Sequence, residues 1–318
     1  MTFQYPIDKL ILSHSSRSTF RRCTRQFEFS KLFGEGSKKD EMFAAEVGKS
    51  LHAGFQEYLI SRDENQAIMK FLLSYPLAME YNKPEYSYNR SLEACYVTLM
   101  ELINSPTADR YELIHIKTQL EGNPTLPAIE VPFAFEIKGA PLPIPVWFVG
   151  FIDAILYDKQ DDIYIVNDIK TTRINVLDMS PRYEFDEQTV PYGIVLEQML
   201  GRKISQFKVS YLSAYIDLMD PKVSMYQFIK TEDHIYDWYR GLCEDIGRIG
   251  KYYNNQYFPR TTNGEVCFSY NKACYFAEFC PIRDPEIIAK LTGGEVREGL
   301  FHDGQQPWIS AQLDWMED

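Results

Sequence analysis

Val146–Thr172 reads VWFVGFIDAILYDKQDDIYIVNDIKTT, two apolar runs separated by the polar turn Asp158–Asp162. Apolar, β-rich runs on either side of a polar turn predict a β-hairpin. Three charged residues interrupt the runs, Asp153 in the first and Asp168 and Lys170 in the second. A charge inside an apolar strand costs free energy unless it is paired or binds a metal. These three residues are therefore the first candidates for a functional site.

The spacing of the three charges predicts that they meet. In an antiparallel pair that turns near residue 160, Asp153 and Asp168 fall opposite each other. Asp168 and Lys170 are two residues apart, so their side chains project from the same face of the strand. Two carboxylates and one ammonium group then converge, either as a buried salt bridge or as the floor of a metal-dependent site.

The composition is that of a folded protein with a sizeable core. The chain has 318 residues, 45% of them hydrophobic, and contains 22 Tyr and 20 Phe. This content excludes a disordered chain. No apolar run approaches the ~20 residues needed to span a bilayer, and the first ten residues lack the layout of a signal peptide. We therefore expect a cytoplasmic protein with no membrane partner.

The charge balance limits how the protein could bind nucleic acid. The net charge is −12 at pH 7, which disfavours a nucleic-acid coat protein because phosphate binding requires basic surface. An enzyme that holds DNA at one local site is compatible with this charge. Residues 13–33 are the most basic stretch and open with hydroxyl residues suited to an N-cap, so they predict one helix. Its basic residues form either a solvated face or a surface for DNA phosphates; they are Arg17, Arg21, Arg22, Arg25 and Lys31.

Further helices and strands are predicted around the hairpin. Hydrophobic periodicity predicts helices over residues 40–62, 63–81, 88–104, 186–200 and 231–253, and strands over 111–119, 129–138, 206–216 and 222–229. A polar loop is predicted over 175–185. This order predicts an α/β fold with one central mixed sheet flanked by helices. We expect a single domain over 1–318, with an N-terminal helical part and helical insertion (13–105), a core (106–255) and a cysteine-bearing loop and tail (256–318).

Three more sets of residues could carry chemistry. His52 follows Gly48 by four residues on a predicted helix, although a single helical His is more often structural than a ligand. Gln188 and Tyr192 are also four apart and share a helical face. Six cysteines in a reducing compartment disfavour disulfides, and clustered cysteines indicate metal. The cysteines of interest are Cys23, Cys267, Cys274 and Cys280.

In order and spacing, these residues resemble the motifs of the PD-(D/E)XK nuclease superfamily. The resemblance is narrower to its RecB-like branch, which includes phage and CRISPR-associated exonucleases. The matching motifs are Gly48-x-x-x-His52, Gly150-Phe-Ile-Asp153, Asp168-Ile-Lys170-Thr171, Gln188-x-x-x-Tyr192 and the split cysteine set. The resemblance spans residues 13–281 and implies a restriction-endonuclease-like core.

Two positions depart from the branch, and one spacing does too. Ile152, not Pro, precedes Asp153, and Thr24 follows Cys23 where relatives often have Pro. The interval between Cys267 and Cys274 is longer than the branch's first cysteine spacing.

The resemblance implies a site for Mg²⁺ or Mn²⁺, ions that take oxygen and imidazole ligands. Asp153, Asp168 and the backbone carbonyl of Ile169 would bind the ion, and His52 would complete its shell. Glu130, in the strand predicted over 129–138, could contribute a further carboxylate.

The remaining motif residues would act on the substrate. Lys170 would orient or help deprotonate the attacking water and neutralise charge in the transition state. Gln188 and Tyr192 would hold Lys170 or the DNA backbone by hydrogen bonds.

The four cysteines would hold a 4Fe–4S cluster by the same resemblance. A structural Zn²⁺ site, which also accepts four thiolates, and ordinary buried cysteines are the alternatives. Cys95 and Cys243 are expected to be ordinary buried residues.

The function implied is a divalent-metal-dependent DNA exonuclease that acts on single-stranded or resected duplex ends. A helicase or recombination partner would supply unwinding, by analogy with the fold family. The alternative is a catalytically inactive, nuclease-like DNA-binding or scaffold protein with a structural Fe–S or Zn site.

Overall fold

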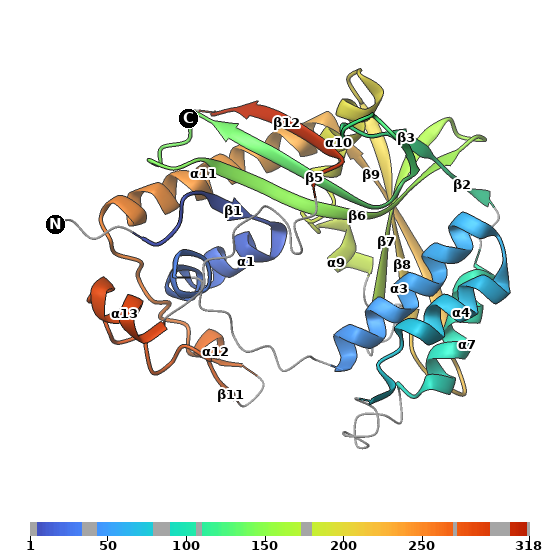
Figure 1. Cartoon of the computed structure of the whole chain (residues 1–318), viewed down its shortest axis with the longest axis horizontal. Coiled ribbons are helices and arrows are strands. Elements are labelled where there is room, and N and C mark those ends of the chain that lie inside the picture. The colour runs from blue at the N-terminus through green and yellow to red at the C-terminus, as the bar shows by residue number, and fades with distance from the viewer. Residues whose placement is uncertain are drawn as a thin grey trace. The chain divides into compact units, whose positions relative to one another are not determined.

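The computed structural model describes residues 5–33, 43–78, 90–105, 110–172, 180–269, 272–292 and 306–316. They form an α/β protein with a central mixed sheet and helices, as predicted (Figure 1). The strand order is β12-β5-β6-β7-β8-β9, and β1 and β2 also pair with β6. No helix among the described residues is both long and apolar enough to cross a membrane.

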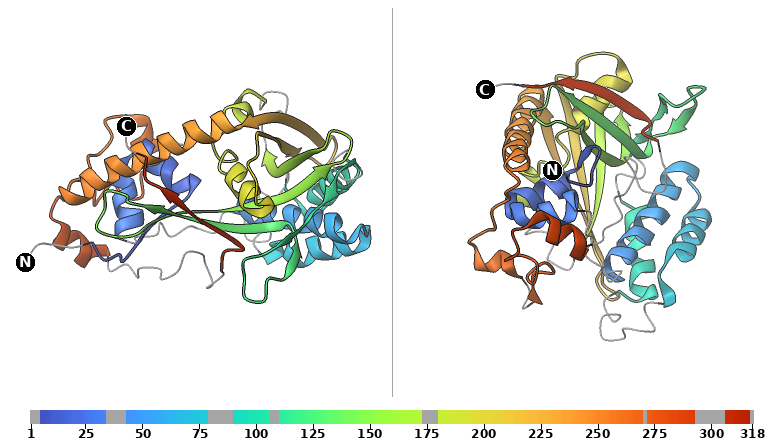
Figure 2. Two further views of the ribbon diagram at one scale, coloured as in Figure 1. Left: turned by 90° about the horizontal axis from the view of Figure 1, so that it is seen from above. Right: turned by 60° about the vertical axis from the view of Figure 1, so that its left-hand side comes forward.

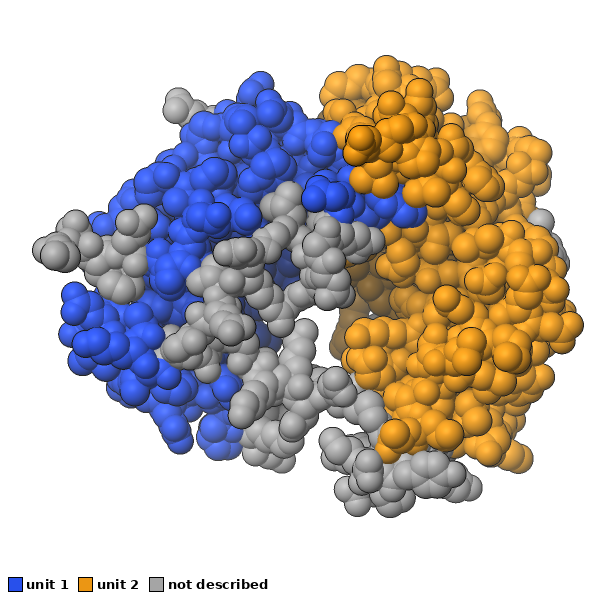
Figure 3. Space-filling model, viewed as in Figure 1, with its two compact units in different colours: residues 1–39, 132–150, 236–318 blue, residues 40–131, 151–235 orange. Residues whose placement is uncertain are grey.

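The chain forms two compact units, coloured separately in Figure 3. Unit 1 comprises residues 1–39, 132–150 and 236–318, and unit 2 comprises residues 40–131 and 151–235. Strands β5 (Ile129–Lys138) and β6 (Val146–Asp158) and helix α11 (Glu232–Asn254) contribute residues to both units. The single domain expected from the sequence remains a prediction.

The hairpin predicted from the sequence is present in unit 2. The second half of β6 pairs antiparallel with β7 (Ile163–Thr172), from Asp158↔Ile163 to Ala154↔Asn167. Strand β7 then pairs parallel with β8 (Gln206–Tyr215), which pairs antiparallel with β9 (Lys222–Thr231). The short strand β2 (Glu112–Leu113) joins β6, and β3 (His115–Lys117) pairs with β4 (Thr125–Pro127).

Three helices of unit 2 lie side by side over one face of its strands (Figure 1). They are α3 (Phe43–Ser61), α4 (Glu64–Ser74) and α7 (Leu92–Ile103). The predicted apolar stripe of α3, including Leu51 and Phe55, packs in one buried cluster with Ile165 and Ile169 of β7. Because side chains alternate along a strand, Asp168 and Lys170 lie on the other face of β7.

Unit 1 is built from segments far apart in the sequence. Strand β1 (Leu10–Leu12) pairs parallel with the start of β6, and β12 (Ile309–Asp314) pairs parallel with β5. Figure 2 shows β12 near α11, where the Tyr239 hydroxyl donates to the carbonyl of Asp314. The C-terminal segment therefore docks on the sheet. The other elements are α13 (Pro285–Thr292), α12 (Gly264–Cys267), β10 (Phe268–Ser269) and β11 (Lys272–Ala273).

The single helix predicted over 13–33 is wrong, because the helix breaks at Cys23. Helix α1 (His14–Arg22) begins with a capping box between Ser13 and Ser16, as the hydroxyl residues predicted. Cys23 is extended (φ −156°, ψ 107°), and α2 (Thr24–Phe27) and a π-helix (Glu28–Leu32) follow. The Thr24 hydroxyl donates to the Pro259 carbonyl. This contact is distant in sequence and holds the chain at the break.

The helix predicted over 186–200 begins later than expected. Helix α10 (Tyr192–Leu200) starts directly after Pro191, and residues 186–191 form turns. A proline disfavours the helical conformation in the residue before it, so the helix cannot extend back through Val190. The loop predicted over 175–185 contains a short helix, α9 (Ser180–Glu184).

Candidate active site

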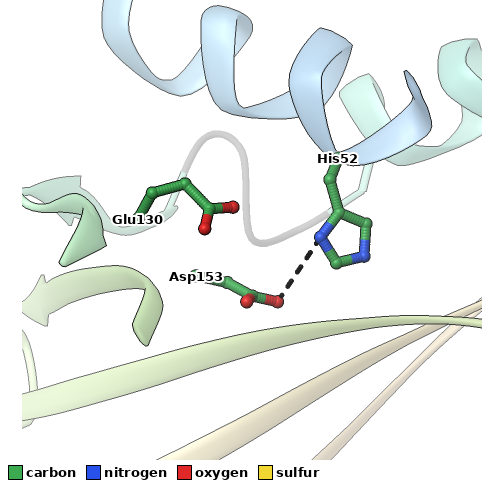
Figure 4. Close-up of side chains that lie close together, drawn as sticks. All are labelled: His52, Glu130 and Asp153. Atoms are coloured by element: carbon green, nitrogen blue, oxygen red, sulfur yellow. Dashed lines mark ion pairs between the residues drawn. The ribbon is translucent and has the colours of Figure 1, made fainter. Parts of the chain in front are cut away.

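Three metal-ligating side chains meet in unit 2 (Figure 4). His52 comes from α3, Asp153 from β6 and Glu130 from the second residue of β5. One ligand atom from each lies within 4.8 Å of the others, and His52 Nδ1 is 3.6 Å from Asp153 Oδ2. We call these residues the His–Glu–Asp cluster.

Helix α3 supplies a second polar side chain to the cluster. Gln56 follows His52 by four residues, so both project from one face of the helix. Its Nε2 donates to Glu130 Oε1 at 2.6 Å and to the carbonyl of Asp153 at 3.4 Å. Gln56 therefore links the helix to both strands that carry the carboxylates.

Asp153 also ties its own strand to β7. Its Oδ2 accepts a hydrogen bond from the backbone N–H of Ile169 at 3.0 Å. Ala154↔Asn167 is the last residue pair of the β6–β7 ladder, and this bond lies just beyond it. The carboxylate of Asp153 is thus placed beside the Asp168–Lys170 segment, where the sequence predicted it.

Lys170 is held by a closed set of contacts next to the cluster. Its Nζ lies 2.8 Å from Asp168 Oδ2 and donates to Gln188 Oε1 at 3.1 Å. Gln188 Nε2 donates in turn to Asp168 Oδ1 at 3.3 Å. The Asp168 side chain is 2% exposed, whereas that of Lys170 is 31% exposed. The lysine side chain is therefore partly exposed to solvent, whereas that of its carboxylate partner is buried.

Two more residues fix the turn that carries Gln188. Asp186 Oδ1 accepts from the backbone N–H of Gln188 at 2.8 Å. The buried Tyr192 donates its hydroxyl to the carbonyl of Phe151 at 3.0 Å, two residues before Asp153 on β6. Tyr192 thus supports the strand of the His–Glu–Asp cluster.

The electrostatics of the site favour a bound cation. Burial raises the pKa of Asp168 to about 6; Lys170 opposes this shift and the nearby Asp153 adds to it. Loss of solvent around Glu130 raises its pKa, and repulsion from Asp153 contributes. Burial opposes the charge of Lys170, but the Asp168 carboxylate outweighs burial and raises the pKa of the lysine. Carboxylates that repel each other in this way are stabilised by a nearby positive charge.

The donor set fits a divalent metal ion. Carboxylate oxygens suit Mg²⁺, and an imidazole nitrogen beside them also suits Mn²⁺. His52 and Asp153 belong to the predicted ligands and lie together with Glu130. The roles predicted for Asp168 and the Ile169 carbonyl as further ligands remain predictions.

Sequence motifs identified Glu130 only as a possible further carboxylate and did not identify Gln56 or Asp186. Gln56 could have been found, because it lies one helical turn after His52 on the same face. Asp186 could have been found as the start of an Asx turn two residues before Gln188. The placement of Glu130 depends on its backbone, which has a φ of 47°, and no residue pattern predicts that conformation for a glutamate.

The four motif cysteines line one cavity of about 460 Å³ in unit 1. Phe29, Phe276 and Arg25 also line it, and Cys23 enters it from the helix break. Among the described residues, no three cysteine sulfurs lie within 4.8 Å of one another. Thiolates around one zinc lie about 3.8 Å apart, given Zn–S bonds of about 2.3 Å. The iron–sulfur cluster and the zinc alternative both remain predictions. Cys95 and Cys243 are buried, as expected.

The basic stretch of residues 13–33 makes internal contacts that the sequence did not predict. Arg17 and Arg25 are buried. Arg17 Nε donates to Asp245 Oδ2 at 2.6 Å, and Arg25 pairs with Glu28 and donates to the Ile282 carbonyl. The hypothesis that these two arginines contact DNA phosphates is therefore wrong. Arg173, a further basic residue considered for a DNA-phosphate surface, lies outside the described residues.

The comparison with protein families agrees with the sequence motifs. The sequence profile of the PD-(D/E)XK nuclease superfamily matches residues 11–281, which include every candidate residue above. No curated protein matches the sequence. A crystal structure named "Putative exonuclease", from Eubacterium rectale, is 15% identical, with 81% of this chain and 85% of that chain covered and a TM-score of 0.46. The crystal structure of a protein named SSO0001 is 12% identical, with 79% and 99% covered and a TM-score of 0.28.

Proposed function

The chain belongs to the PD-(D/E)XK nuclease superfamily, and from this premise we propose that it is a metal-dependent DNA exonuclease of the RecB-like branch. It would hydrolyse phosphodiester bonds from DNA ends, either single-stranded or resected. One observation carries the proposal: the His–Glu–Asp cluster lies beside a lysine that Asp168 and Gln188 hold in place. The Asp153 bond to the Ile169 N–H joins the two groups.

The site would hold Mg²⁺ or Mn²⁺ through His52 and Asp153, with Asp168 and the Ile169 carbonyl as further ligands by family resemblance. When bound, such an ion supplies Lewis-acid stabilisation of the charge that develops on the scissile phosphate.

Lys170 would act as a fixed positive charge and hydrogen-bond donor. Its raised pKa keeps the ammonium form at neutral pH, which favours donation to the phosphate or to the attacking water over proton abstraction. Gln188 accepts from Lys170 and donates to Asp168, so it orients both members of the ion pair. A positioned donor costs no reorganisation when the reaction occurs.

The test compares linear with covalently closed circular DNA in the presence of Mg²⁺ or Mn²⁺. We expect the wild-type protein to degrade linear DNA from its ends and to leave closed circles intact. Lys170→Ala is expected to lower the rate by about 10²–10⁴-fold, the usual effect of one positioned catalytic group. Lys208→Ala is the matched control, because this lysine of the adjacent strand pairs with Asp161 in the turn. Equal activity of the wild type and Lys170→Ala would contradict the assignment, and rapid nicking of closed circles would make the enzyme an endonuclease.

The cysteine cavity would hold a 4Fe–4S cluster through Cys23, Cys267, Cys274 and Cys280. The cluster would link the break between α1 and α2 to the C-terminal cysteine segment, and its role would be structural. The cavity that all four cysteines line supports a group bound there in common. Anaerobically purified protein is expected to be brown, to absorb near ~400 nm and to contain iron and sulfide. A colourless preparation with stoichiometric zinc would support the alternative of a zinc site.

A further inference from the structure

Glu130 has a backbone conformation that side-chain-bearing residues rarely adopt. Its φ is 47°, in the left-handed region that costs a non-glycine residue about 1 kcal/mol or more. The residue lies at the start of β5. With this backbone, the carboxylate lies toward Asp153 and His52 (Figure 4). A like-charged neighbour makes this placement unfavourable unless a positive charge is bound there.

The spacing of the cluster matches what one small cation requires. Ligands at about 2.0–2.1 Å from an octahedral ion are separated by roughly 3 Å when adjacent and 4 Å when opposite. One donor atom each from His52, Glu130 and Asp153 already lies within 4.8 Å of the others. Side-chain adjustments of roughly 1–2 Å at most would bring all three onto one ion.

The hydrogen bond from Gln56 determines which carboxylate oxygen of Glu130 is left to coordinate such an ion. The Gln56 amide donates to Oε1, and a carboxylate has a second oxygen that can accept or coordinate. Outer residues that orient metal ligands in this way contribute about 10–100-fold to metal affinity. Because Gln56 and His52 share a face of α3, one helix fixes both the imidazole and the carboxylate.

We propose that Glu130 is a side-chain ligand of the divalent cation bound by His52 and Asp153, and that Gln56 is its positioning residue. The inference rests on the metal site of the proposed function. It adds a carboxylate to that site and predicts that Glu130 contributes to metal affinity independently of Asp168, whose oxygens are engaged by Lys170 and Gln188.

The test measures Mn²⁺ binding to the metal-free full-length protein by titration calorimetry, without DNA. Glu130→Gln is expected to weaken binding at least tenfold. Gln56→Met, which keeps the length of the side chain but removes the amide, is expected to weaken it about 10–100-fold. Glu136→Gln is the matched control, since this carboxylate is on the same strand but pairs with Lys138, and it should stay within twofold of wild type. Melting of the metal-free variants close to wild type would show that the losses are not due to unfolding.

The variants separate this inference from the proposed function. If Asp153→Asn abolishes Mn²⁺ binding while Glu130→Gln stays within twofold of wild type, Glu130 is not a ligand and the inference fails, although the metal site stands. If the wild-type protein binds no Mn²⁺, both the inference and the metal-dependent mechanism fail. If Glu130→Gln binds weakly but Gln56→Met binds as wild type does, the positioning role of Gln56 is wrong.

Discussion

At the scale of single residues, the local sequence identified the charged residues that interrupt apolar strands, but it did not identify every residue that contacts them. Asp153, Asp168 and Lys170 could be identified because each interrupts an apolar strand. The contact between Asp168 and Lys170 follows from the two-residue period of a strand, and the structure has it at 2.8 Å. Glu130 could not be ranked in this way, because its position depends on a φ of 47° that the chain adopts only in its folded context.

Glu28 provides a pH-dependent test of a buried charge in unit 1. Burial raises the pKa of Glu28, although Arg25 and the Tyr5 hydroxyl oppose the shift. The folded protein then binds more protons at this site than the unfolded chain does, so stability falls as pH rises above the usual glutamate range. Glu28→Gln removes this dependence. Relative to wild type, the variant should therefore become more stable as pH rises above the usual glutamate range, measured by urea unfolding at each pH.

Asp63 is the matched control, because its pKa is lowered whereas that of Glu28 is raised. Asp63 caps α4 by accepting from the backbone N–H groups of Asn65 and Gln66. Hydrogen bonds with Gln66, first from its side chain, lower the pKa of Asp63, so its stabilising effect is present at neutral pH and is lost as pH falls. Asp63→Asn should lose stability relative to wild type as pH rises. If the stability difference from wild type changed with pH in the same direction in both variants, the opposite pKa shifts of Glu28 and Asp63 would be wrong.

At the scale of elements, α3 carries two glycines that separate stability from site geometry. A Cβ on Gly48 would lie 3.2 Å from Thr171 Oγ1, whereas one on Gly54 would lie 2.9 Å from Phe71 Cβ in the core. Alanine gains about 1 kcal/mol over glycine inside a helix, and an overpacked core loses about 1–3 kcal/mol. Gly54→Ala should therefore lower the free energy of unfolding.

Gly48→Ala should leave stability nearly unchanged and act on the site. The higher helix propensity of alanine offsets the cost of the close contact between its Cβ and Thr171 Oγ1. The contact is expected to move α3 away from β7 and so to shift His52, which lies one turn further along the helix. We expect weaker Mn²⁺ binding with an unfolding midpoint close to wild type, measured by calorimetry and urea unfolding. Weaker binding in Gly54→Ala, with normal binding in Gly48→Ala, would show that the Gly48–Thr171 approach does not set the position of His52.

The elements that were predicted correctly are those whose bounds follow from the local pattern of apolar and polar residues. Strand β5 runs from Ile129 to Lys138 as predicted, and the β6–β7 hairpin turns at the predicted polar segment. The helix break at Cys23 could not be predicted, because it involves Pro259, more than 200 residues away. The late start of α10 could have been predicted from Pro191 and the restriction it places on Val190.

At the scale of the whole molecule, it matters whether the two units unfold together. Strands β5 and β6 and helix α11 each contribute residues to both units. Unfolding of one unit therefore disrupts strands that also belong to the other unit. This continuity favours the single cooperative domain that the sequence predicted. The four tryptophans lie at positions 147, 238, 308 and 315, all within unit 1, so tryptophan fluorescence reports on that unit alone.

Asp245 is the residue through which this cooperativity can be tested. Its carboxylate accepts from Arg17 and Arg21, at 2.6 and 2.8 Å, inside unit 1. Asp245→Leu leaves the buried Arg17 without that carboxylate, which typically costs about 3–5 kcal/mol. If the chain is one domain, this loss should appear equally in the fluorescence transition and in the hydrogen exchange of the slowest α3 amides in unit 2. A loss confined to fluorescence would mean that unit 2 folds independently, and the nuclease site would then be expected to survive the unfolding of the cysteine-bearing unit.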